Sequence, residues 1–111
     1  MRHNTKGVVL HCFKYSDSSL IARVFTQDLG IKSFIVKGVR SKKSKLNINV
    51  LRPLSLIDME VYSKNGADDR LGNLVFYSSA TIAIKEDFAK SAITIFIAEL
   101  YETVRGFSHR I

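Results

Sequence analysis

Five short runs of β-branched and aromatic residues, separated by turn signals, most constrain what this chain can fold into. They occupy residues 7–13, 20–26, 31–39, 54–63 and 74–77. In the fourth run the apolar residues Ile57, Met59 and Val61 alternate with polar neighbours. That period of two is typical of a strand with one buried face and one solvated face. Five such strands within about 75 residues predict a small barrel or sandwich.

Glycine and asparagine mark the connections between these runs. Residues 27–30 form a short connection in which Gly30 can adopt a positive φ, so the second and third runs are expected to pair as a hairpin. Asn65-Gly66 is a turn signal after the fourth run. Pro53, the only proline, precedes that run, where its missing amide proton is tolerated.

The pattern becomes helical after residue 83. Glu86 and Asp87 fall in the first turn, where acidic side chains interact favourably with the helix dipole, and Gly106 is the expected C-cap. Between residues 88 and 104 apolar side chains cover nearly every face. Such a helix needs apolar partners on more than one side, and the barrel can cover only one. We therefore expect a helical domain that continues beyond this chain, or else burial of the helix by dimerisation.

Positive charge is concentrated in one segment of the chain. The formal net charge is +7, and residues 29–57 hold seven of the 17 basic residues and none of the 10 acidic ones. The remainder of the chain is therefore electrically balanced. Because concentrated positive charge attracts polyanions, this segment is the expected nucleic-acid-binding site, and a solvated loop without a partner is the alternative.

Six basic side chains are expected to neutralise backbone phosphates and release counterions. They are Lys37, Arg40, Lys42, Lys43, Lys45 and Arg52. Each contact should steepen the salt dependence of binding by about 0.7 to 0.9 in log–log slope. Phosphate contacts carry no sequence information, so a site of this kind would accept any DNA.

Four further residues complete the predicted site. Lys14 and Arg23 would extend the basic surface. Tyr15 and Phe34 would stack on bases, the second element of binding by oligonucleotide-binding (OB) folds. The alternative for Phe34 is a place in the core, since phenylalanine in an alternating strand commonly points inward.

Three segments, in this order and spacing, resemble the beginning of RecO-family proteins. They are residues 7–11 (Gly-Val-Val-Leu-His), residues 14–20 (Lys-Tyr-Ser-Asp-Ser-Ser-Leu) and residues 36–44 (Val-Lys-Gly-Val-Arg-Ser-Lys-Lys-Ser). The resemblance covers all 111 residues. It implies a mainly β fold, with a five-stranded OB-type Greek-key barrel at residues 1–83 and the start of a truncated helical domain at residues 84–111.

The resemblance also implies a role in recombinational DNA repair. Members of the family bind single- and double-stranded DNA, anneal complementary strands and help to load the recombinase RecA onto strands coated by single-strand-binding protein. The implied protein partners are RecR and the tail of the coating protein, the latter through the helical domain. No cofactor is implied. Some relatives carry a cysteine zinc site, and the single cysteine of this chain does not provide one.

No set of residues supports an enzymatic function. His11 and Cys12 are adjacent in a strand and should point to opposite faces, so we do not expect a nucleophile–base pair, and Cys12 is expected to be a core residue. The three histidines lack metal-ligand spacing, and no glycine-rich loop would cradle a phosphate. A single cysteine, no signal peptide and no long apolar run indicate the cytoplasm.

Two other functions are compatible with the residues. One is a protein-docking adaptor in which the barrel mainly binds RecR and the basic segment is secondary. The other is an RNA-binding OB domain of the translation apparatus. Charge reversal at Lys42 and Lys43 separates the adaptor from the DNA-binding module, because only the latter needs those lysines.

Overall fold

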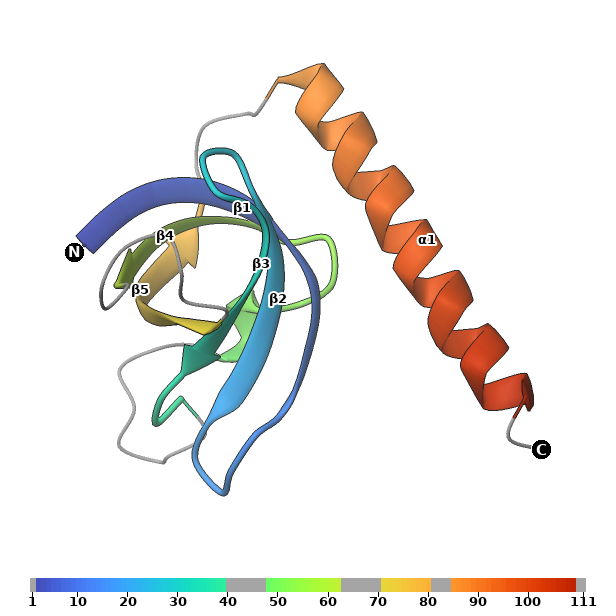
Figure 1. The fold of residues 1–111 in the computed structure, drawn as a ribbon. Coiled ribbons are helices and arrows are strands. Elements are labelled where there is room, and N and C mark those ends of the chain that lie inside the picture. Colours follow the sequence, from blue (N-terminus) through green and yellow to red (C-terminus); the bar gives the residue numbers. More distant parts are fainter. Residues whose placement is uncertain (1, 40–47, 63–70, 81–84, 110–111) are drawn as a thin grey trace.

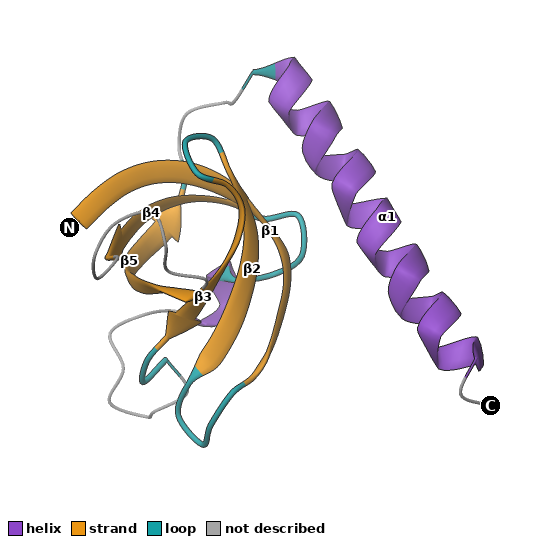
Figure 2. Cartoon of the chain, in the orientation of Figure 1, coloured by secondary structure: helices purple, strands orange, loops and turns teal. Residues whose placement is uncertain are grey.

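Residues 2–39, 48–62, 71–80 and 85–109 are described by the computed structural model of this chain. They form five strands that close into a barrel, a short 3-10 helix and one long α-helix beside the barrel (Figures 1 and 2). The elements are β1 (Arg2–Lys14), β2 (Leu20–Thr26), β3 (Gly30–Val36), η1 (Ile48–Val50), β4 (Leu56–Tyr62), β5 (Leu71–Ser79) and α1 (Glu86–His109). No helix in these ranges is long and apolar enough to cross a membrane.

The strand order β1-β2-β3-β5-β4 confirms the predicted OB-type barrel. The strand β1 is long and curved, and it pairs with β4 along its first half and with β2 along its second half. A parallel pairing of β3 with β5 closes the barrel. The predicted β2–β3 hairpin is also confirmed, with Thr26 paired to Gly30 and a φ of 70° at Gly30.

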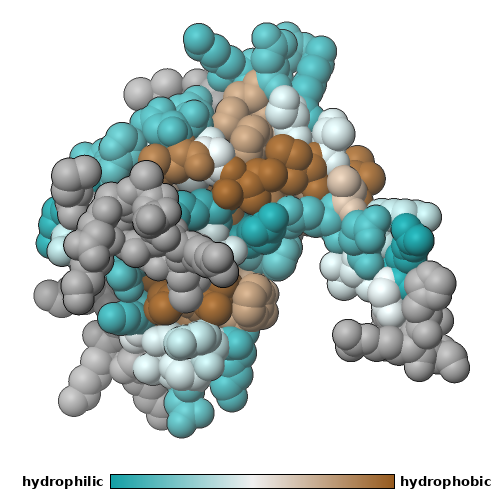
Figure 3. Space-filling view, in the orientation of Figure 1, coloured by the Kyte–Doolittle hydropathy of each residue, from teal (hydrophilic) through white to brown (hydrophobic). Residues whose placement is uncertain are grey.

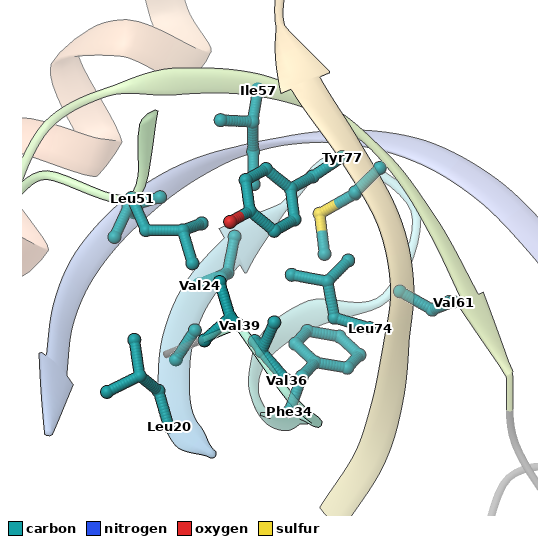
Figure 4. Close-up of a cluster of buried hydrophobic side chains, with 13 residues drawn as sticks. Leu20, Val24, Phe34, Val36, Val39, Leu51, Ile57, Val61, Leu74 and Tyr77 are labelled. Carbon is teal, nitrogen blue, oxygen red and sulfur yellow. The ribbon is translucent and has the colours of Figure 1, made fainter. Parts of the chain in front are cut away.

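Inward-pointing side chains from all five strands fill the barrel (Figure 4). Phe34, Val9, Val24, Val36 and Ile57 have no exposed surface at all. These side chains alternate with outward ones along β2 and β4, as the period of two predicts. The third predicted run is shorter than expected, since β3 ends at Val36. A positive φ of 72° at Gly38 then turns the chain, and Val39 re-enters the core.

A β-bulge in β1 changes which residues face inward. The register with β2 shifts between Val9 and His11, so Leu10 is the extra residue that a bulge inserts. Val9 belongs to the barrel core, and the partly buried Cys12 packs against that core. His11 and Phe13 are consequently exposed, on the outer face of the barrel. Leu10 is fully buried and lines a cleft together with Phe96 of α1.

The helix α1 packs on the barrel along one side. Phe88 stacks on Phe25 of β2, with ring centroids 4.5 Å apart and an interplanar angle of 11°, and Ala92 is buried. Other apolar side chains of α1 remain largely exposed, namely Ile93, Ile97, Leu100, Tyr101 and Val104. Figure 3 shows hydrophobic side chains gathered over the middle of α1 and toward the barrel. The division into an OB domain and the start of a helical domain stays a prediction.

The predicted C-cap at Gly106 is wrong, because α1 continues through it to His109. Gly106 does not adopt the positive φ that a C-cap glycine would use. The physical reason is that the energetic cost of one glycine in a helix is small. A glycine inside a helix costs only about 1 kcal/mol relative to alanine, so it does not by itself end a helix.

Two glycines should respond in opposite ways to replacement by alanine. At Gly7 a Cβ would lie 2.5 Å from Val24 Cγ1 and 3.2 Å from the carbonyl oxygen of Phe25. Gly7→Ala should therefore lower the free energy of unfolding by about 1–3 kcal/mol, as overpacking does. Gly106 has no atom within 4 Å of the added Cβ, so Gly106→Ala should raise that free energy by up to about 1 kcal/mol. Urea unfolding followed by circular dichroism measures both, and equal effects would contradict the packing at Gly7.

Candidate nucleic-acid interface

Two predicted basic residues lie at the same end of the barrel. Lys14, the last residue of β1, pairs with Leu20 of β2, which pairs in turn with Val36 of β3. Lys37 directly follows Val36, so β2 lies between it and Lys14, and both side chains are exposed. Neighbouring strands are about 4.8 Å apart, so the backbones that carry the two cations are about 10 Å apart, within reach of one nucleic-acid backbone.

The loop between β1 and β2 is fixed to the turn that follows β3. The backbone amides of Tyr15 and Ser16 donate to the carbonyl oxygen of Ser19 at 3.0 and 3.2 Å. The amide of Gly38 donates to the Ser19 hydroxyl at 3.3 Å. Ser19 is buried, whereas the Tyr15 side chain is 57% exposed. The loop therefore holds an exposed aromatic ring next to Lys14 in sequence, and it is tied through Ser19 to the turn that carries Lys37.

Phe13 lies on the outer face of β1 beside this end of the barrel, and it was not predicted from the sequence. Its side chain is 49% exposed, and its ring lies 6.1 Å from the His11 ring at an interplanar angle of 27°. In an uninterrupted strand Phe13 would share the inward face with Val9. The bulge at Leu10 turns it outward, and nothing in the sequence marks that bulge. We call His11, Phe13 and Tyr15 the aromatic stripe.

Phe34 is corrected from a stacking residue to a core residue. Its side chain has no exposed surface, and its ring fills the space above Gly72 of β5. A ring enclosed in this way is not accessible to a base. The basic neighbour Lys32 reaches toward this ring, with its Nζ 5.9 Å from the ring centroid.

The other predicted site residues differ in how they are placed. Arg52 is exposed and begins a turn whose Leu54 amide donates to the carbonyl oxygen of Val9, so it lies beside the middle of β1. Arg23 lies on the outer face of β2, but its Nε binds the carboxylate of Glu99 from α1 at 2.9 Å. The remaining four predicted residues lie outside the described part of the chain: Arg40, Lys42, Lys43 and Lys45.

Cys12 is a structural residue. Its thiol packs against the core and donates to the carbonyl oxygen of Leu51 at 3.6 Å. Burial raises the pKa of the Cys12 thiol to about 11, so the thiol stays protonated and a poor nucleophile at neutral pH. His11 points away from it, toward Glu99. The predicted absence of a His11–Cys12 pair agrees with this geometry.

A groove of about 600 Å³ lies on the other side of the barrel, over β1, β4 and β5. Phe76 lines it and is 55% exposed. Three acidic residues also line it, and each is paired with a basic group of β1. The pairs are Arg2–Glu60 at 2.6 Å, His3–Asp28 at 3.0 Å and Lys6–Asp58. Because the cations here are already neutralised, this side offers little attraction for a polyanion.

Comparisons with known proteins agree with the family resemblance. The family model described as recombination protein O, N terminal, matches residues 1–79. A DNA repair protein RecO from Bacteroides fragilis is 39% identical over 107 residues, which are 95% of this chain and 44% of that protein. Another, from Flavobacterium psychrophilum, is 35% identical over 90% of this chain and 42% of the relative. The chain therefore spans less than half the length of these relatives.

Proposed function

The chain belongs to the RecO family of DNA repair and recombination proteins, and on that premise we propose that it is a DNA-binding and strand-annealing module. The observation that carries the proposal is the surface at the end of β1. There the exposed Lys14 and Lys37 lie at the barrel end next to the loop that carries exposed Tyr15, and exposed Phe13 lies on the adjoining outer face of β1. Cations that hold the backbone beside rings that stack on bases are the combination typical of single-strand binding.

The lysine-rich segment extends this surface in the proposal. It begins at Arg40, three residues after Lys37, and continues with Lys42, Lys43 and Lys45. Lysines so close in sequence to the described surface would add phosphate contacts and counterion release. Arg52 would supply a further contact beside β1. The proposed role of these side chains rests on their sequence position and charge.

Annealing on such a surface requires neither a cofactor nor a catalytic residue. Two complementary strands repel each other through their phosphates, and a cationic surface screens that repulsion when both strands are bound. We propose that the module lowers the barrier to pairing in this way and catalyses no covalent step. Phosphate contacts do not read sequence, as suits repair of any DNA. Loading of RecA, and binding to single-strand-binding protein through the helical domain, are proposed only for the longer protein. The cytoplasmic location of the chain stays a prediction.

Removal of the aromatic stripe tests the stacking part of the proposal. Phe13→Ala and Tyr15→Ala should each weaken binding to single-stranded DNA by about tenfold, since one stacked base is worth about 1–3 kcal/mol. Phe76→Ala is the matched control, because it removes a similarly exposed phenylalanine from the other side of the barrel. Fluorescence anisotropy with a labelled oligonucleotide measures all three. Equal affinities for the Phe13 and Phe76 variants would remove Phe13 from the interface.

A second function, docking of RecR, is favoured by the groove on the opposite side. Exposed aromatic residues are typical of the energetic centres of protein interfaces, and Phe76 has 55% of its surface exposed beside paired charges. This function does not compete with DNA binding, because the groove uses the first half of β1 with β4 and β5, whereas the DNA interface lies at the end of β1. The relatives are DNA repair proteins, so we do not propose an RNA-binding role in translation.

A further inference from the structure

A carboxylate from α1 occupies an anion-binding position on the outer face of the barrel. Both oxygens of Glu99 lie 2.9 Å from Arg23 Nε, and Oε1 lies 3.3 Å from His11 Nε2. His11 and Arg23 face each other across the β1–β2 ladder. The three side chains are between 23% and 46% exposed, so the position borders solvent. We call it the Arg23 site.

The Arg23 site adjoins the proposed DNA interface. His11 forms one side of the site and also stacks on Phe13, so the aromatic stripe ends at this position. Guanidinium groups bind carboxylates and phosphates through the same donors. A nucleic-acid strand that follows the stripe would therefore bring a phosphate to the place that Glu99 occupies.

The helix is attached to the barrel by different interactions near its start and around its middle. Near its start, Phe88 stacks on Phe25 and Ala92 is buried. Glu99 comes seven residues after Ala92, about 10 Å further along the helix. There α1 meets the barrel at the ion pairs and at a cleft of about 210 Å³ lined by Leu10, Phe96 and Leu100. Partly exposed ion pairs contribute little to stability, so this half of α1 is the easier one to detach.

We propose that the Arg23 site is a phosphate subsite of the DNA interface, which Glu99 covers when no nucleic acid is bound. A backbone phosphate and the Glu99 carboxylate then compete for Arg23, and binding of DNA releases the second half of α1 from the barrel. The inference rests on the proposed DNA-binding function. To that function it adds Glu99 as a group within the same chain that competes with DNA for Arg23.

Neutralising Glu99 should strengthen DNA binding. Glu99→Gln keeps the shape of the side chain but removes the competing charge. The Glu99→Gln variant should bind single-stranded DNA about three- to tenfold more tightly than the control variant Glu102→Gln. The log–log salt slope of its binding should be steeper by about 0.7. Glu102 has the same charge on the same helix, is 70% exposed and pairs only weakly with Arg105 at 3.9 Å. Adding Arg23→Gln to Glu99→Gln should abolish the gain.

The outcomes separate this inference from the proposed function. If the unmodified chain binds DNA and Glu99→Gln binds no more tightly than Glu102→Gln, the inference is overturned and the proposed function stands. If neither the unmodified chain nor any variant binds at about 50 mM salt, the proposed function fails as well. Hydrogen exchange on the unmodified chain tests the same point without substitution. Saturating DNA should speed amide exchange in the second half of α1, and unchanged exchange would contradict release of the helix.

Discussion

Charge reversal of three lysines, Lys42→Glu, Lys43→Glu and Lys45→Glu, is expected to lower affinity for single-stranded DNA by about 100-fold or more at 100 mM salt. Because each lysine that binds a phosphate contributes about 0.7 to the log–log salt slope, the variant should also show a slope that is flatter by roughly two units. The lysines belong to the segment that holds the whole excess charge of the chain. Fluorescence anisotropy across a salt series measures both quantities.

A control with the same change in net charge shows whether position matters. Lys85→Glu, Lys90→Glu and Arg105→Glu change three exposed basic residues at or on α1. They should reduce affinity far less and leave the slope nearly unchanged, because loss of distant charge acts only through a screened field. Equal losses in both triple variants would contradict a localised site. If the first variant loses DNA binding and still binds RecR, the DNA and RecR surfaces are distinct.

Replacing Phe34 with alanine is expected to destabilise the fold by about 3–5 kcal/mol, the loss typical of a fully buried phenylalanine. Its ring has no exposed surface and belongs to the barrel cluster (Figure 4). Small domains have about 5–15 kcal/mol of total stability, so the variant would be partly unfolded at moderate temperature. Urea unfolding followed by circular dichroism gives the difference in free energy of unfolding between Phe34→Ala and the unmodified chain.

Phe13→Ala is the matched control for that experiment. Phe13 is 49% exposed, so its removal should cost much less stability than removal of Phe34. The two phenylalanines should then show opposite phenotypes, with Phe34 important for folding and Phe13 for binding to DNA. A loss below about 1 kcal/mol for Phe34→Ala would contradict its place in the core.

The barrel was predictable because its local signals agree with one another. The second strand matches the predicted residues 20–26, and the hairpin follows from the turn at Gly30. The strand with a clean alternation, β4, has the predicted buried face at Ile57, Met59 and Val61. In each case the burial pattern and the turn residues favour the same structure, so sequence alone was sufficient.

The candidate site was harder to predict, for identifiable reasons. In β3 both faces carry apolar residues, so alternation does not show whether Phe34 or Ile35 points inward. In β1 the bulge reverses the orientation of Phe13. The partner of Arg23 lies 76 residues away in sequence, and no local pattern indicates it. Each of these depends on tertiary packing, which periodicity does not encode.

The most direct test of the DNA-binding function is the salt dependence of the unmodified chain. Binding of a labelled single-stranded oligonucleotide would be followed by fluorescence anisotropy from about 50 to about 200 mM salt. If about four of the predicted basic residues engage phosphates, affinity should fall with a log–log slope of about −3. No binding at the lowest salt concentration, or a slope near zero, would contradict an electrostatic DNA interface on this barrel.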